Sequence, residues 1–238
     1  MINDYLTILS RIILVILLLA PVPETAAQRT VNGTDDVYGS DPLLYNGKFY
    51  TFFSPLNAGG NQYLNDRQFE PGTVTLRGVK YTDLLLNYDI YNQQLLLEYK
   101  GEPGLTQVII LSDAWLETFS IKDKNFRIFQ ISDNEKRIYQ EIGADQTRVL
   151  YFWKKYRQVE NITGGTKMIF TKPAREMNLL TDGKIVTYRN NRSFVNLFGP
   201  ENKEVVREYI HGHRVNVKKA SDKIMAGLIN YVNTPGGK

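Results

Sequence analysis

The chain holds only two histidines, His211 and His213, and one residue separates them. On a β-strand this spacing would place both imidazoles on the same face, where they could chelate a metal ion. Gly212 lies between them at the expected end of a helix, which would divide the two rings between different elements. We therefore expect solvated imidazoles at a helix end, and we predict no metal site and no cofactor.

The segment from Tyr151 to Arg157 (YFWKKYR) combines aromatic rings with positive charge. In an extended strand alternate residues share a face, which groups Tyr151, Trp153 and Lys155. One interpretation is a surface that binds a protein, a glycan or an anionic lipid headgroup through ring stacking and charge. Its candidate contact residues are Tyr151, Trp153, Lys155 and Arg157. The alternative is a strand whose faces divide core from rim, with cationic side chains covering apolar surface, which is the more common use of such residues.

No residue pattern predicts a catalytic site. The segment 164–167 (GGTK) lacks the spacing of a phosphate-binding loop and leads into a strand, so we interpret it as a hairpin turn. A glycosidase needs two carboxylates about 5–10 Å apart across a cleft, and a sequence does not establish that separation. The acids that come closest to a pair are Asp35 and Asp36 with Asp41, and Asp113 with Glu117. The chain also has no nucleophile elbow and no zinc-protease helix motif.

Composition excludes several further classes of protein. The 238 residues include no cysteine, and the formal net charge is +4. Without cysteine there is no disulfide framework, no thiolate nucleophile and no cysteine-built metal site. Hydrophobic residues make up 42% and charged residues 23%, which is typical of a globular chain and not of a disordered one. The small positive excess, taken to be spread along the chain, predicts no nucleic-acid partner.

The N-terminus has the order of a secretory signal peptide. Residues 12–20 are nine consecutive apolar residues that follow Arg11, and prolines and small residues come after them. This order predicts a signal peptide over residues 1–27, because the apolar run is shorter than the roughly 20 residues that span a bilayer. Residues 28–41 are polar and rich in turn formers, and we expect a flexible leader there. No later segment approaches the length of a membrane span, so we predict none in the mature chain.

Residues 42–190 carry the signals of an antiparallel β domain. Short runs of β-forming residues recur at intervals of about 8–12 residues with turn residues between them, and no helical crossover intervenes. Asn46-Gly47 predicts a hairpin turn between residues 43–45 and 48–53, and Arg77-Gly78 predicts another turn. We expect an antiparallel sandwich or a barrel-like meander.

The last segment, residues 191–238, changes to a helical period. We expect one or two turns over residues 191–197, a helix over residues 201–211 and a third helix over residues 223–233 that Ser221 caps. The apolar stripe of the third helix is predicted to consist of Ile224, Leu228, Ile229 and Val232. The predicted fold class is therefore mainly β with a small C-terminal helical cap packed on the sheet, α+β overall.

Several short stretches of this layout resemble a family of exported proteins. They are residues 45–50 (YNGKFY), 72–75 (GTVT), 78–81 (GVKY), 86–89 (LNYD), 182–184 (DGK) and 194–198 (FVNLF). With these stretches the chain resembles uncharacterised exported β-rich proteins of Bacteroidetes-type bacteria. The resemblance implies a place in the envelope of a Gram-negative cell, in the periplasm, at the outer membrane or outside it. It implies no activity and no catalytic residues.

From these observations we expect a non-enzymatic exported cell-envelope protein that binds a protein partner or a surface complex. A small-ligand or glycan-binding β module is the first alternative, since some of the 15 tyrosines could line a groove. A hydrolase with dispersed carboxylates is the second alternative. The sequence does not decide the oligomeric state.

Overall fold

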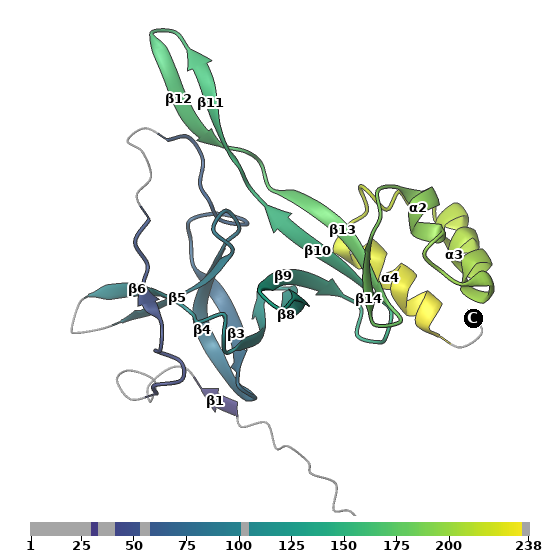
Figure 1. Ribbon diagram of the computed structural model, residues 1–238, viewed down its shortest axis with the longest axis horizontal. Coiled ribbons are helices and arrows are strands. Elements are labelled where there is room, and N and C mark those ends of the chain that lie inside the picture. Colours follow the sequence, from purple (N-terminus) through teal and green to yellow (C-terminus); the bar gives the residue numbers. More distant parts are fainter. Residues whose placement is uncertain (1–29, 33–40, 53–57, 101–104, 235–238) are drawn as a thin grey trace, which may run out of the picture.

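The computed structural model describes residues 30–32, 41–52, 58–100 and 105–234 (Figure 1). Strands account for 48% of the structure and helices for 16%, so the mainly β fold with C-terminal helices is confirmed. The predicted signal peptide, residues 1–27, lies outside the described residues. Most of the expected leader does too, but its residues Thr30–Asn32 form strand β1, which pairs in parallel with β4.

The remaining elements follow in chain order. The strands are β2 (Lys48–Phe49), β3 (Glu70–Leu76), β4 (Val79–Asp89), β5 (Gln94–Lys100), β6 (Thr106–Ile110), β7 (Leu116–Ile121), β8 (Lys124–Ser132), β9 (Glu135–Ile142), β10 (Arg148–Lys154), β11 (Arg157–Ile162), β12 (Gly165–Phe170), β13 (Ala174–Thr181) and β14 (Lys184–Thr187). The helices are α2 (Asn191–Val195), α3 (Pro200–Gly212) and α4 (Asp222–Asn233).

Twelve of the strands form one sheet in the order β14-β13-β10-β9-β8-β7-β3-β4-β5-β6-β2, with β1 beside β4. Most neighbours in this order are consecutive in the chain, which is the predicted meander. Strands β11 and β12 form a separate two-stranded sheet that continues the β10–β13 pair outward (Figure 1). The three helices lie at the β14 end of the large sheet, beside β10 and β13 (Figure 1).

The structure confirms one of the two predicted hairpin turns and contradicts the other. Arg77 and Gly78 have φ of 47° and 77°, the left-handed pair that a two-residue hairpin turn requires, and they join β3 to β4 as predicted. The hairpin predicted at Asn46-Gly47 is wrong, because β2 pairs with the distant strand β6. A Cβ atom on Gly47 would lie 2.3 Å from the carbonyl oxygen of Ile110. This glycine therefore permits a close approach between two strands and does not make a turn.

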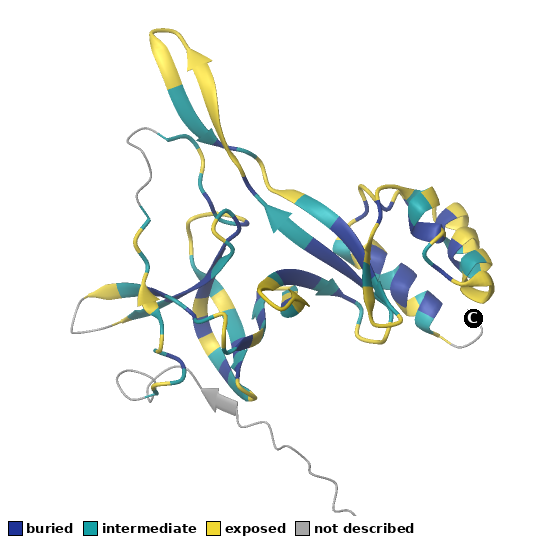
Figure 2. Cartoon of the chain, in the orientation of Figure 1, coloured by how far each residue is buried: buried dark blue, intermediate teal, exposed yellow. Residues whose placement is uncertain are grey.

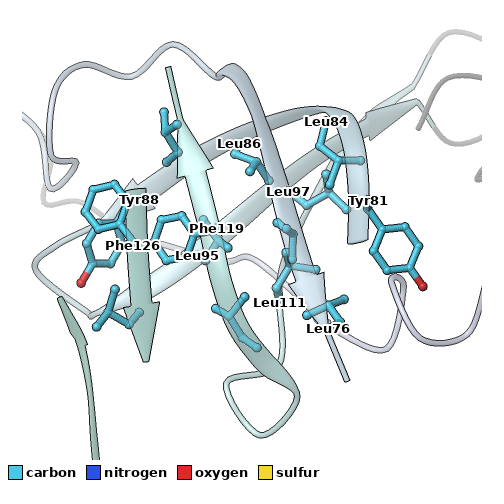
Figure 3. Close-up of a cluster of buried hydrophobic side chains, with 14 of the residues drawn as sticks. Leu76, Tyr81, Leu84, Leu86, Tyr88, Leu95, Leu97, Leu111, Phe119 and Phe126 are labelled. Atoms are coloured by element: carbon cyan, nitrogen blue, oxygen red, sulfur yellow. The ribbon is translucent and has the colours of Figure 1, made fainter. Parts of the chain in front are cut away.

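A first hydrophobic cluster fills the space enclosed by β3 to β8 (Figure 3). Phe119 and Phe126 stack with their ring centroids 4.6 Å apart, and the Tyr88 ring meets both edge-on. Leu86 and Leu97 pair across β4 and β5 in the same cluster. These side chains are almost completely buried, so this cluster is the core of the strand-rich part of the molecule.

A second hydrophobic cluster lies between the β10–β13 strands and the helices. Ser221 caps α4 as predicted, since its side chain accepts from the Ile224 N–H at 3.3 Å. The buried stripe of α4 consists of Met225, Leu228, Ile229 and Val232. The prediction that Ile224 belongs to this stripe is wrong, because Ile224 is 46% exposed. No helix within the described residues is long and apolar enough to cross a membrane.

Strand β9 connects the two hydrophobic clusters. Ile138 belongs to the first cluster and Ile142 to the second, and both lie on the same face of the strand. Gln140 lies between them and is buried. Its amide donates to Asp222 at 2.7 Å and accepts from the Trp153 indole at 2.8 Å. A polar contact therefore separates the two cores along a shared strand.

Candidate binding surface

The most exposed strands belong to the separate hairpin of β11 and β12, residues 157–170, which we call the arm. All six residues of β11 are exposed, and the arm projects beyond the rest of the molecule (Figure 2). The hairpin turn predicted at residues 164–167 is present at its tip, but the turn residues are Thr163 and Gly164, and Gly165 already begins β12. The arm continues β10, and the four predicted contact residues lie along β10 and the start of the arm.

The inner part of that strand, β10, faces the second hydrophobic cluster. Tyr151 is fully buried there, and the guanidinium of Arg175 lies 4.1 Å from the centre of its ring. Trp153 is half-buried, and the Arg175 guanidinium is 5.9 Å from its ring. Burial raises the pKa of the Tyr151 hydroxyl, which the charge of Arg175 partly opposes. Both rings are therefore engaged inside the molecule.

Lys155 is the next predicted contact residue, and it is also enclosed. Its side chain is 7% exposed, and its ammonium donates to the carbonyl oxygen of Asn61 at 3.0 Å and to the side-chain oxygen of Asn61 at 2.9 Å. It also donates to the Tyr63 carbonyl. Burial lowers the pKa of Lys155, and the negative charges of Asp89 and Asp66 oppose this shift. The lysine thus fastens the end of β10 to residues 61–63.

Arg157 is the one predicted contact residue with an exposed side chain. It is the first residue of β11, and its guanidinium lies 5.1 Å from the centre of the Tyr91 ring. Tyr91 in turn meets Phe170 of β12 edge-on at 5.5 Å. The structure therefore brings the four residues into one line along β10 and β11 but not onto one exposed surface. Their role in binding a partner stays a prediction.

A buried carboxylate that sequence reasoning missed stabilises the same region. Asp89 is completely buried, and the Tyr50 hydroxyl and the Asn92 amide each donate to one of its oxygens at 2.8 Å. Its other oxygen accepts from the N–H groups of Tyr91 and Asn92. Burial raises the pKa of the Tyr50 hydroxyl, and a hydrogen bond from Gln62 opposes the shift. The local Asp-x-x-Asn spacing could have indicated the turn, but not the contact with Tyr50.

The base of the arm also indicates which way its backbone groups point. The Gly59 N–H donates to the Met168 carbonyl at 2.8 Å, and the Phe170 N–H donates to the Gly59 carbonyl at 2.9 Å. Backbone groups of alternate residues in a strand point to the same side, so those of Met168 and Phe170 point away from β11. Their partners in the register are Val159 and Arg157. The backbone groups of these two residues therefore point outward, away from β12.

The outer edge of β11 is open. Among the residues that the structure describes, only β12 pairs with β11. Val159 is 65% exposed and Ile162 is 49% exposed. By strand alternation these two apolar side chains lie on opposite faces of the arm. The arm thus offers free backbone hydrogen-bonding groups together with apolar side chains on either side of them.

Lys124 and Arg175 converge on Asp222, the first residue of α4, from the sheet. The carboxylate accepts from Lys124 at 2.6 Å and lies 3.8 Å from an Arg175 nitrogen. Burial alone would raise the pKa of Asp222, but the hydrogen bonds from Lys124 and Gln140, with the positive charges nearby, outweigh it and lower the pKa. This contact holds the N-terminus of α4 against β8 and β9.

The other chemistry-bearing residues are dispersed. His211 lies in α3 and His213 follows the helix, with its ring stacked on Tyr209 at 4.0 Å. Asp41 accepts from the Tyr81 hydroxyl, and Glu117 accepts from a backbone N–H in the β3–β4 turn. Asp35 and Asp36 lie outside the described residues. Over residues 41–52, 58–100 and 105–234 no three His, Asp or Glu side chains gather into a group that could hold a metal ion.

Comparisons of the chain with protein-family models, with curated proteins and with solved structures found no match. The resemblance to exported β-rich proteins therefore stays a prediction.

Proposed function

We propose that this protein is exported to the cell envelope and acts there by binding another protein, which adds a strand to the outer edge of β11. The observation that carries the proposal is the open edge of the arm, where the backbone groups of Arg157 and Val159 point outward. Unpaired N–H and C=O groups of an edge strand are a template for pairing with an extended segment of another chain.

The form of the arm supports a partner of this kind. An isolated two-stranded hairpin is only marginally stable in water, because it lacks a hydrophobic face that is covered. The arm nevertheless carries Val159 and Ile162 in water, outside both hydrophobic clusters. A partner strand would satisfy the backbone groups and cover these side chains at the same time. Its extended segment would need apolar residues where it meets Val159.

The glycan alternative has less support from the same segment. Sugars stack on the exposed faces of aromatic rings, as bases do on the platforms of nucleic-acid-binding proteins. Tyr151 is buried and shares the Arg175 guanidinium with Trp153, so neither ring is presented as a free platform. A protein partner at the arm uses the part of the strand that is exposed.

The experiment replaces Val159 with a photo-crosslinking amino acid in the full chain, expressed in the cells that make the protein. The matched control places the same amino acid at Ile224, which is exposed on α4, far from the arm. The proposal expects one recurrent protein to be crosslinked from position 159 and not from position 224. Identical adducts from the two positions, or none from position 159, would overturn it.

A second variant separates strand pairing from other contacts. The Val159 N–H points outward, so Val159→Pro removes a donor from the edge without removing a hydrogen bond to β12. Val159→Thr keeps that N–H and is the matched control. We expect the proline variant to fold with unchanged far-ultraviolet circular dichroism and to lose the crosslink from a probe at Arg157, whereas the threonine variant keeps it. Retention of the crosslink in both folded variants would exclude strand addition.

A further inference from the structure

The helical end of the molecule contains a groove between α2, α3 and the segment that follows α3. Its volume is about 840 Å³. Its lining includes three arginines and three apolar residues, which are Arg192, Arg207, Arg214, Val195, Ile210 and Val215. We call this space the α2–α3 groove. It lies at the end of the sheet away from β2, so it is separate from the arm (Figure 1).

Three guanidinium groups line the α2–α3 groove, one from each of its walls. Arg192 belongs to α2, Arg207 to α3 and Arg214 to the segment after α3. Arg207 forms an ion pair with Glu204 one turn away. No carboxylate of a described residue lies within ion-pair distance of Arg192 or Arg214. Like charges gathered in one concavity repel each other, and an anion bound between them would remove that cost.

The segment that forms the α2–α3 groove carries an excess of positive charge. Residues 189–219 hold seven Lys and Arg and three Glu, an excess of four positive charges. The net charge of the entire chain is also +4, so the remaining residues balance to zero. A field of one sign over a concave surface raises the local concentration of anions.

The walls of the α2–α3 groove are held in place before any ligand arrives. The Asn191 amide donates to the Val215 carbonyl at 2.7 Å, and its oxygen accepts from the Val217 N–H at 2.9 Å. These two bonds clamp the start of α2 to the segment after α3. His213 stacks on Tyr209 and so fixes the turn that precedes Arg214. A site whose walls are already ordered loses less entropy when it binds.

The floor of the α2–α3 groove is apolar. Val195, Ile210 and Val215 are buried and belong to the second hydrophobic cluster. Inorganic phosphate is hydrated on all sides and gains nothing from such a floor. A molecule that carries an anionic head and a less polar body can use both the guanidinium groups and the floor.

We propose that the α2–α3 groove binds a phosphate ester, with Arg192 and Arg214 as the principal contacts. Guanidinium groups match the geometry of phosphate oxygens and bind them by paired, charge-assisted hydrogen bonds. The ester body lies against the apolar floor. The ligand is either a soluble phosphorylated compound or the headgroup of a phospholipid, and both present the same chemistry to the groove.

The test uses phenyl phosphate as the soluble probe, titrated into the full chain in a calorimeter at low ionic strength. Arg192→Gln with Arg214→Gln removes the two unpaired guanidinium groups. Lys218→Gln with Lys219→Gln is the matched control, since it removes the same charge from the same end of the molecule without touching the α2–α3 groove. All four side chains are exposed, so both variants should fold, which circular dichroism checks.

We expect saturable binding of phenyl phosphate that the arginine variant weakens by about tenfold or more, since each lost charge-assisted hydrogen bond is worth about this factor. The lysine variant should change the affinity by less than about threefold, through screened long-range charge alone. Equal losses in both variants, or no saturable binding to the unaltered chain, would overturn the proposal.

Vesicles distinguish the two sources of the ester. The probe is phosphatidylglycerol mixed with phosphatidylcholine, compared with phosphatidylcholine alone, in a sedimentation assay. Binding to the mixed vesicles that depends on Arg192 and Arg214 and that phenyl phosphate displaces supports a lipid headgroup. Binding of phenyl phosphate without vesicle binding supports a soluble ester. Failure of both probes refutes the α2–α3 groove as a phosphate-ester site and leaves the proposed role of the arm unaffected.

Discussion

Replacing Lys155 with methionine tests whether a buried ammonium fixes the base of the arm. Methionine keeps the length and apolar body of the side chain but removes its charge and its hydrogen bonds. In the structure the ammonium donates to two oxygens of Asn61 and to the Tyr63 carbonyl. The K155M variant leaves these acceptors without their donor in a region that water barely reaches.

The expected loss of stability follows from opposing contributions. Hydrogen bonds to a charged group contribute roughly 1.5–3 kcal/mol each, so three of them set an upper bound of about 9 kcal/mol. Burial of the ammonium offsets much of this, which is why the pKa of Lys155 is lowered. Removing one partner from a buried charged contact costs about 3–5 kcal/mol, and methionine also relieves the desolvation of the charge. We therefore expect a loss of about 3 kcal/mol.

Lys154 provides the matched control, because it is the adjacent residue on the opposite face of β10. Its ammonium lies 3.0 Å from Glu176, and its side chain is 32% exposed, so K154M should cost less than about 1 kcal/mol. Urea unfolding of the three proteins, followed by tryptophan fluorescence, measures both differences. A loss below about 1 kcal/mol in K155M, equal to that in K154M, would refute the view that Lys155 fastens the arm.

Three further changes test the packing of the helical end by urea unfolding. Leu228→Ala should cost about 2–4 kcal/mol because this side chain is completely buried, whereas Ile224→Ala, on the exposed side, should cost less than about 0.5 kcal/mol; equal costs would contradict the assigned buried face. Gly143→Ala should cost about 1–3 kcal/mol, because φ is +96° and the new Cβ would lie 2.7 Å from an α4 side chain. Gly164→Ala, with φ of +91° and open space around it, should cost less. Asp222→Asn should lower stability near neutral pH. A lowered carboxyl pKa adds stability above the unfolded value of about 3.9 and loses it as the pH falls through the folded value, so the difference from the unaltered chain should narrow as the pH is lowered below about 3.9. A difference that does not narrow on acidification, while both proteins remain folded, would contradict the role given to the carboxylate.

Local signals predicted those parts of the fold that depend on a few neighbouring residues. The Arg77-Gly78 turn and the Ser221 cap are examples, because backbone conformation and one side-chain oxygen decide them. The same reasoning gave a wrong hairpin turn at Asn46-Gly47. Its glycine is required by the carbonyl of Ile110, more than sixty residues further along the chain, and a turn signal does not carry that information.

The sequence did not determine which residues of α4 begin its buried stripe. Ile224 and Met225 are both apolar and adjacent, so the helical period admits either as the first residue of the buried stripe. The contacts of the helix with β9 and β10 decide in favour of Met225. The pattern therefore establishes that the helix is amphipathic, while the neighbouring strands determine which edge of its apolar face is covered.

The sequence predicted where the candidate binding surface lies, but not which of its side chains are buried or that the edge of β11 is open. The alternation of aromatic and cationic residues drew attention to Tyr151–Arg157, and this strand does lead into the arm. Whether each side chain is covered depends on Arg175 and on residues 61–63, which are distant in sequence. Gly59 contacts the edge of β12, while the outer edge of β11 has no partner strand among the described residues, and no property of the β11 residues alone indicates this difference.

The division of the interior along β9 has a consequence for how the molecule opens. Because Ile138 and Ile142 belong to different cores and the polar contacts of Gln140 lie between them, release of α4 from the sheet removes side chains from one core only. Amide protons of β3 to β8 would then stay protected from exchange while those of the helices and β14 are already exchanging. Partial opening of this kind would free β14 and the helices without melting the rest of the sheet.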